Sequence, residues 1–192
     1  VPTVAQRAIR QAVEFSGLEV AGTVYSLVAH ASAIVAAQDS QRFLLIDVGG
    51  VSTDLGVFDG SHLVASDTLP WGGQTLADTI AKSLQVTPEQ ATVLTLQGLA
   101  SRKPDVKQCL EDALSQLEQA IERLLHGEAK PTQAWVTGRG ALIDGLAERV
   151  ERVTRIKTAI SRSRRFSEMT DLSRQVGLST ALALPPEFAG LD

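Results

Sequence analysis

The sequence predicts a layered α/β fold: a mixed sheet with a three-strand meander, flanked by helices, plus a small helical subdomain. Three observations favour it. A fully apolar run over residues 43–46 is followed by two further strand-like segments joined by short turns. Residues 104–124 carry one apolar stripe at helical spacing. Residues 133–150 then repeat a strand, a glycine turn and a helix.

The first 84 residues are predicted to form two helices, the meander and a third helix. Pro2 and the apolar spacing before Gly17 predict a helix over residues 2–16, and 20–24 are expected to be a short strand. Residues 25–37, small and apolar, predict a buried helix. The meander strands are residues 41–46, ending in a turn at 47–50, then 54–58 and 62–69. Asp59-Gly60 predicts the second hairpin, and a helix over 74–84 follows.

The second half is predicted to be mainly helical. Thr87-Pro88-Glu89-Gln90 combines an N-cap, a first-turn proline and a capping-box glutamine, so a helix begins there. The long helix that begins at Pro104 ends at Gly127. The remaining elements are a strand at 133–137, a helix from 140 to about 150, an edge strand at 155–160 and a helix at 172–184.

Composition excludes several classes of protein. Of the 192 residues, 44% are hydrophobic and 21% charged, which is the balance of an ordinary globular chain. The single cysteine, Cys109, excludes a disulfide framework and a multi-cysteine zinc site. The net charge of −4 argues against nucleic-acid binding. No apolar run reaches the ~18 residues of a membrane span. Because the chain begins with Val1-Pro2, we expect it to be a piece of something longer.

The histidines give little indication of a site. His30, His62 and His126 lie far apart in the sequence and show no ligand spacing. No carboxylate partner for His30 can be identified along the chain, so the sequence assigns it no catalytic role.

The first candidate site lies where the apolar strand ends. Asp47 is followed by the turn Gly49-Gly50-Val51-Ser52-Thr53, in which glycines let backbone amides approach an anion closely. The Ser52 and Thr53 hydroxyls are expected to donate to phosphate oxygens, and Asp47 to hold a magnesium ion through water. The alternative is an ordinary β-hairpin with a glycine turn. The segment is no P-loop, because no Gly-Lys-Ser/Thr follows.

Two further glycine pairs lie at element junctions. Gly72 and Gly73 precede a predicted helix whose N-terminal amides would attract an anion. Gly138-Arg139-Gly140 lies between a strand and a helix, at the strand's carboxyl end, where ligands of open α/β sheets usually bind. Each pair alone is more often a structural turn. Together, the three turns predict a common cleft.

These motifs resemble those of the actin-like ATPase superfamily, in its second, ribonuclease H-like lobe. Residues 45–55, LIDVGGVSTDL, are similar to its second phosphate motif, and residues 136–146, VTGRGALIDGL, to its adenosine motif. Residues 69–76, LPWGGQTL, resemble the Gly-Gly turn of the FtsA and PilM families, residues 1–37 their connection from the first lobe, and residues 176–182 their closing helix. The resemblance implies ATP and magnesium as cofactors, with Asp47 positioning the magnesium and the attacking water.

The resemblance also implies a domain organisation. Residues 1–40 would be connecting helices from a first lobe that this sequence lacks. Residues 41–84 and 131–186 would form the core α/β subdomain, residues 85–130 a helical insertion, and residues 187–192 a tail. Because the first lobe carries the other phosphate motif, this lobe alone would be an incomplete ATPase site.

Four positions depart from the family pattern and predict a weakened nucleotide pocket or no bound cofactor. Val51 replaces a glycine of the phosphate turn, and Arg139 the middle glycine of the adenosine turn, where it could instead contact a phosphate or stack on a base. Thr92 and Thr95 stand at the two positions where the resembling FtsA and PilM families have the glutamate and the lysine of an Ala-Glu-x-x-Lys pattern. Each loss is expected to remove about 1 kcal/mol of hydrogen bonding or charge assistance.

Three functions remain open: an assembly or docking module for division or pilus machinery, an active ATP-binding half-site, and an unrelated α/β domain. The first implies protein partners, self-association and a cytoplasmic place, peripheral at the inner face of the membrane. Contact with the membrane would be indirect or through a basic segment within residues 149–165, whose alternative is a solvated surface. Its basic residues are Arg149, Arg152, Arg155, Lys157, Arg162, Arg164 and Arg165.

Overall fold

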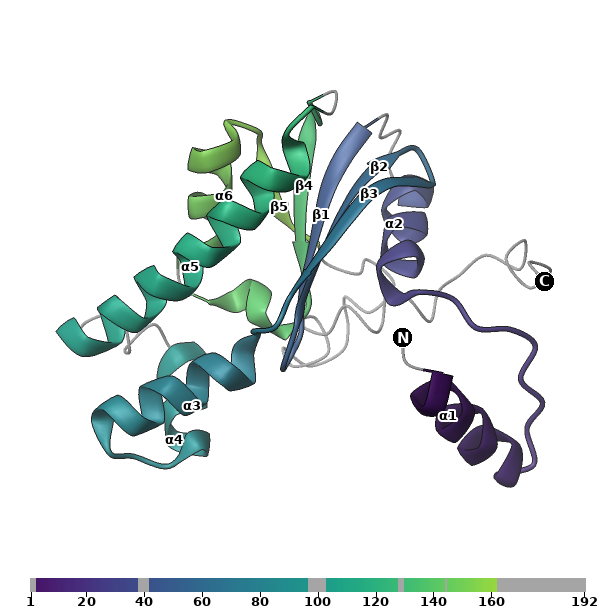
Figure 1. The fold of residues 1–192 in the computed structure, drawn as a ribbon, viewed down its shortest axis with the longest axis horizontal. Helices are drawn as coiled ribbons and strands as arrows, with labels where there is room; N and C mark the ends of the chain where they lie inside the picture. The colour runs from purple at the N-terminus through teal and green to yellow at the C-terminus, as the bar shows by residue number, and fades with distance from the viewer. Residues whose placement is uncertain (1–2, 38–41, 97–102, 128–129, 144, 162–192) are drawn as a thin grey trace.

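The computed structural model describes residues 3–37, 42–96, 103–127, 130–143 and 145–161. A mixed five-stranded sheet lies at its centre with helices on both faces (Figure 1). This architecture confirms the α/β fold class predicted from the sequence.

The sheet is built from an antiparallel meander extended by two parallel strands. Strands β1 (Arg42–Val48), β2 (Thr53–Asp59) and β3 (His62–Leu69) form the meander. Strand β4 (Gln133–Thr137) pairs in parallel with β1, and β5 (Thr158–Ile160) in parallel with β4. The strand order is therefore β3-β2-β1-β4-β5, and the carboxyl ends of β1 and β4 meet at the same edge of the sheet.

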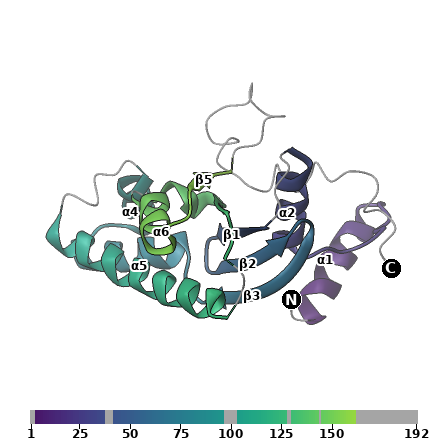
Figure 2. The same ribbon diagram turned by 90° about the horizontal axis from the view of Figure 1, so that it is seen from above.

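The helices form two layers of unequal size. Helix α2 (Ser26–Ala37) covers one face, whereas α5 (Pro104–Leu125) and α6 (Leu146–Thr154) lie on the other (Figures 1 and 2). Helices α3 (Gly73–Leu84) and α4 (Pro88–Leu96) extend this second layer beyond the turn end of the sheet. No helix in the described ranges is both long and apolar enough to cross a membrane.

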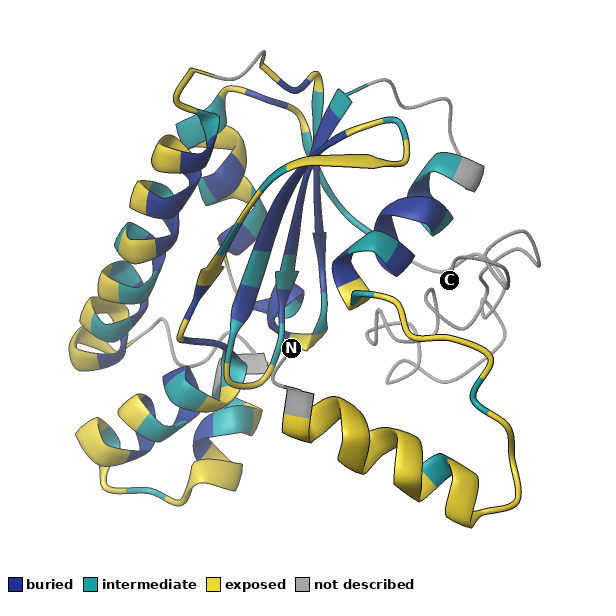
Figure 3. Ribbon diagram, turned by 45° about the vertical axis from the view of Figure 1, so that its right-hand side comes forward, coloured by how far each residue is buried: buried dark blue, intermediate teal, exposed yellow. Residues whose placement is uncertain are grey.

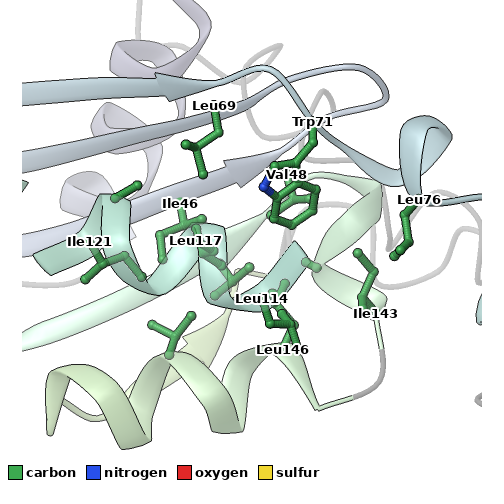
Figure 4. Close-up of a cluster of buried hydrophobic side chains, with 14 of the residues drawn as sticks. Ile46, Val48, Leu69, Trp71, Leu76, Leu114, Leu117, Ile121, Ile143 and Leu146 are labelled. Atoms are coloured by element: carbon green, nitrogen blue, oxygen red, sulfur yellow. The ribbon is translucent and has the colours of Figure 1, made fainter. Parts of the chain in front are cut away.

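Alternation along β1 divides the core in two, because successive side chains of a strand point to opposite faces. Phe43 and Leu45 pack under α2, where the Phe43 and Phe58 rings stack with centroids 5.3 Å apart. Ile46 and Val48 belong to the larger cluster on the other face (Figure 4). That cluster also takes in α5, which therefore shares one core with the sheet.

Helix α1 (Thr3–Phe15) stands away from this core. Figure 3 shows it almost entirely exposed, and its large apolar side chains Val4, Ile9 and Phe15 are 79%, 62% and 96% exposed. Apolar spacing forms the helix as predicted, but the described residues give it no apolar surface to cover.

Some predicted boundaries are wrong. Residues 20–24 are not a strand; they form an irregular link between α1 and α2. The residues predicted as the start of a turn, Asp47 and Val48, extend β1, because both pair with β2 and Asp47 also pairs with β4.

The segment after β4 also differs from the prediction of one helix. Arg139–Leu142 is a single 3₁₀ turn, η2, and α6 begins afresh at Leu146 after Gly145, whose φ of 77° is left-handed. Arg155, with φ 55°, ends α6 and shortens the predicted edge strand to Thr158–Ile160. The helix expected at 172–184, which includes the closing-helix resemblance at 176–182, lies outside the described residues.

Candidate functional site

Two of the three glycine turns touch directly. The amide of Gly73 donates to the carbonyl oxygen of Gly49 at 2.9 Å, and the amide of Gln74 to that of Gly50 at 2.7 Å. Gly72 lies so close to this turn that a Cβ there would be 2.5 Å from the Gly49 oxygen. The start of α3 is therefore joined to the turn that follows β1.

The third glycine turn packs against the end of β1. A Cβ on Gly138, whose φ is +80°, would lie 2.6 Å from Asp47 Oδ1, and a Cβ on Gly140 would overlap the Val48 side chain. Such close approach is available only to glycine. The structure thus brings Asp47 and all three turns together, as the sequence predicted from their positions at strand ends.

The turn between β1 and β2 holds a small set of uncommitted backbone donors. The Gly49 amide closes the turn by donating to the Ser52 carbonyl at 2.9 Å. The amides of Gly50, Val51 and Ser52 make no hydrogen bond to any described residue. Gly50 and Val51 are exposed and Ser52 is half-buried. These three N–H groups can receive an anion.

Other donors predicted to face a phosphate are used inside the protein. Thr53 is fully buried, and its hydroxyl donates to the Trp71 carbonyl at 2.8 Å. Of the first amides of α3, those of Gly73 and Gln74 donate to the β1–β2 turn, and that of Gly72 donates to the Thr75 hydroxyl at 2.7 Å. The helix N-terminus at Gly72-Gly73 is therefore largely satisfied by protein acceptors.

Asp47 lies on the α2 face beside a residue that the sequence left without a role. His30 Nδ1 is 3.4 Å from Asp47 Oδ2, and the two side chains are 6% and 15% exposed. The expectation that His30 has no carboxylate partner is therefore wrong. One signal could have indicated the contact: His30 lies on the same helical face as Leu27 and Ile34, in the helix that precedes the strand carrying Asp47.

A row of polar side chains continues from Asp47 across the sheet. Asp54 of β2 lies directly opposite Asp47, and Thr68 of β3 opposite Asp54, so their side chains share the α2 face. The Thr68 hydroxyl donates to Asp54 at 2.7 Å. Tyr25, before α2, lies beside the same carboxylate. Burial, and then the negative charge of Asp54, raise the pKa of the Tyr25 phenol.

The site fits an anion better than a magnesium ion. Three free turn amides suit phosphate oxygens. Magnesium, however, takes oxygen ligands and several waters in near-octahedral geometry. Asp47 presents one oxygen to the Gly138 backbone and the other to His30.

Three of the positions that depart from the family pattern are Arg139, Thr92 and Thr95, and their surroundings differ. Arg139 begins η2, is exposed and forms no ion pair with a described residue. Thr92 is half-buried on α4, where its hydroxyl donates to the Pro88 carbonyl at 2.8 Å. The side chain of Thr95 lies outside the described part.

The basic segment is only partly available at the surface. Arg149 is half-buried and pairs with Glu111 on α5 at 2.7 Å and with Glu118. Arg152, Arg155 and Lys157 are exposed. The other predicted basic residues, Arg162, Arg164 and Arg165, lie outside the described residues.

The fold is that of the actin-like proteins. A chain in the PilM–PilN type IV pilus biogenesis complex aligns with 93% of this chain and 57% of its own length, at 19% identity and a TM-score of 0.75. MreB5 of Spiroplasma citri bound to ADP aligns with 95% of this chain and 64% of its own length, at 16% identity and a TM-score of 0.74. Ethanolamine utilization protein EutJ from Carboxydothermus hydrogenoformans covers 88% and 58%, at 21% identity and 0.65. These likenesses establish the fold.

The family follows from the sequence comparison. The model of the family described as cell division protein FtsA matches residues 44–183, and the chain belongs to this family. Cell division protein FtsA of Bacillus subtilis (strain 168) is 31% identical over 80 residues, which are 41% of this chain and 18% of that protein. The chain spans less than two thirds of the length of each of these relatives.

Proposed function

We propose that this chain is an assembly and docking lobe of the FtsA type with a weakened nucleotide pocket, acting in the cytoplasm at the inner face of the membrane. One observation carries the proposal: several of the groups expected to hold a nucleotide have partners within the protein instead. The α3 amides donate to the β1–β2 turn, Thr53 donates to Trp71, and Asp47 faces His30. The three turns then act as a structural joint that fixes α3 and η2 to the sheet.

The departures from the family pattern support the same proposal. A side chain stands at Val51 and at Arg139, where the related motifs have glycine, and both side chains are exposed at the turns. At Thr92, a neutral hydroxyl bonded to its own helix replaces a carboxylate. A pocket with these changes binds nucleotide weakly or not at all, while the fold is kept.

One observation favours a second function, the ATP-binding half of an actin-like ATPase. The free amides of Gly50, Val51 and Ser52 are suited to stabilising the charge of a terminal phosphate. The neighbour MreB5 was solved bound to ADP, which supports nucleotide binding by a protein of this fold. In this function, a first lobe outside residues 1–192 completes the site.

The proposed domain organisation follows the sequence prediction. Residues 1–40 connect to that first lobe, 41–84 and 131–186 form the core, 85–130 are the helical insertion, and 187–192 are a tail. The exposed apolar side chains of α1 support a first lobe as its packing partner.

Calorimetric titration with ATP and magnesium separates the two functions, with the first lobe supplied if the gene encodes one. We expect no saturable binding at micromolar ATP, and the same result for Asp47→Ala. Micromolar binding that is lost in Asp47→Ala would establish the ATPase half-site instead.

The triple variant Arg139→Gly, Thr92→Glu, Thr95→Lys is expected to bind ATP more tightly than the natural chain, and no gain would count against the pocket assignment.

The membrane-proximal part of the proposal has its own test. Cosedimentation with anionic vesicles at low salt is expected to weaken when Arg152, Arg155 and Lys157 are changed to Glu, because all three are exposed cations. The matched control changes Lys82, Lys103 and Lys107, exposed on other helices or just before one, to Glu. Equal losses in the two variants would show a general charge effect and contradict a basic docking segment.

A further inference from the structure

His30 and Asp47 are in contact on the α2 face of the sheet. His30 is 5% exposed and comes from the face of α2 that packs on the sheet. Its Nδ1 lies 3.4 Å from Asp47 Oδ2, and Oδ1 of the same carboxylate lies against Gly138. The carboxylate is thus enclosed on one side by backbone and on the other by the imidazole.

The local charge balance makes this contact important. Asp54 stands directly opposite Asp47 on the same face, and like charges placed so repel one another. Asp54 is bonded by Thr68 and adjoins Tyr25, which are neutral partners. Among the described residues, neither carboxylate forms an ion pair with a lysine or an arginine. His30 is therefore the described basic side chain that lies next to this pair, with Nδ1 3.4 Å from Asp47 Oδ2.

We propose that His30 takes the place at Asp47 that a divalent cation would otherwise occupy, so that this lobe presents a metal-independent site. The His30 ring lies against Asp47 Oδ2, with Nδ1 at 3.4 Å, and occupies the side from which a metal or its water would reach that oxygen. This inference rests on the proposed function, in which Asp47 is the carboxylate that would face a nucleotide. It deepens that function by giving the weakness of the pocket a specific cause.

Manganese, which can be followed by electron paramagnetic resonance without nucleotide, provides the direct test. We expect Mn²⁺ to bind His30→Ala at least fivefold more tightly than the natural chain, and this gain to vanish in His30→Ala/Asp47→Asn. His30→Asn, which keeps an N–H donor near the position of Nδ1, should retain the weak binding of the natural chain. His62→Ala, at an exposed histidine of β3, is the matched control and should change nothing. Equal Mn²⁺ affinity in the natural chain and His30→Ala would overturn the proposal.

A double-mutant cycle supplies a second readout that does not depend on metal. The unfolding constants of His30→Ala, Asp47→Asn and the double variant should depart from additivity by at least fivefold, because each single change leaves a buried partner behind. Additive effects would contradict the pairing.

The outcome with ATP distinguishes this inference from the proposed function. Micromolar ATP binding that persists in a chelator would refute the weakened pocket and leave the role of His30 standing. ATP binding that requires Mg²⁺ or Mn²⁺ in the natural chain would refute the role of His30.

Discussion

Changing Gly72 to alanine tests the contact between the first two glycine turns. The added Cβ would lie 2.5 Å from the Gly49 oxygen and 2.7 Å from the Gly50 oxygen, whereas ordinary contacts begin at 3.4 Å. The turn must therefore move by about 0.9 Å (3.4 minus 2.5), which weakens the hydrogen bonds from Gly73 and Gln74. Overpacking of this kind costs about 1–3 kcal/mol, and each weakened bond up to about 1 kcal/mol.

We therefore expect Gly72→Ala to lower the free energy of unfolding by about 2–4 kcal/mol, measured by urea denaturation with far-ultraviolet circular dichroism. Gly73→Ala is the matched control. Its Cβ would meet nothing closer than 3.8 Å, and alanine is the better helix former, so its stability should stay within about 0.5 kcal/mol of the natural chain or rise. Two adjacent glycines with equal effects would refute the convergence of the turns.

Three further predictions use side chains around the same sheet. Tyr25 is the only tyrosine of the chain, so the absorbance of tyrosinate reports the ionisation of this one phenol. Burial and the charge of Asp54 should place the pKa of Tyr25 above 10.0, and Asp54→Asn should lower that pKa. Because the fold favours the neutral phenol, this contribution to stability is complete below pH 10 and lost as pH rises through the folded-state pKa; a midpoint at or below 10.0 would contradict the burial. Arg149→Met should lower the free energy of unfolding by about 1–3 kcal/mol, because it removes the ion pairs that join α6 to α5. Arg152→Met, at an exposed residue, is the control and should lower it by less than about 0.5 kcal/mol. Equal losses of stability in urea denaturation would contradict a role for these ion pairs. Thr53→Val should lower the free energy of unfolding by about 1–2 kcal/mol in the same assay, because it removes the buried hydrogen bond to the Trp71 carbonyl, and Thr53→Ser should lower it less. Equal stability of the valine variant and the natural chain would contradict that bond.

The strands and the meeting of the turns could be predicted from local signals. Alternation and turn residues set the bounds of β3 and β4, and the Asp59-Gly60 turn fixed the second hairpin. The three glycine turns were expected to face a common cleft because all three lie at the ends of predicted strands or helices. In the structure, Asp47 pairs in register with Thr137, the residue before Gly138. Side-chain period and turn composition are properties of short segments, so sequence carries them well.

The use of each polar group could not be predicted, because it depends on tertiary register. Whether the Gly73 amide faces solvent or the Gly49 oxygen is decided by how α3 docks on the turn. The His30–Asp47 contact depends on the rotation of α2 over the sheet. The break between η2 and α6 requires the left-handed conformation at Gly145, which a helical apolar pattern does not reveal.

We infer that the start of α3 and the β1–β2 turn are bonded to each other and are not held open for a nucleotide. Amide hydrogen exchange, followed residue by residue by NMR with and without ATP and magnesium, tests it most directly. We expect the amides of Gly73 and Gln74 to be protected and those of Gly50 and Val51 not to be, with unchanged exchange rates when nucleotide is added. Rapid exchange at Gly73 and Gln74 that slows only in the presence of nucleotide would contradict it.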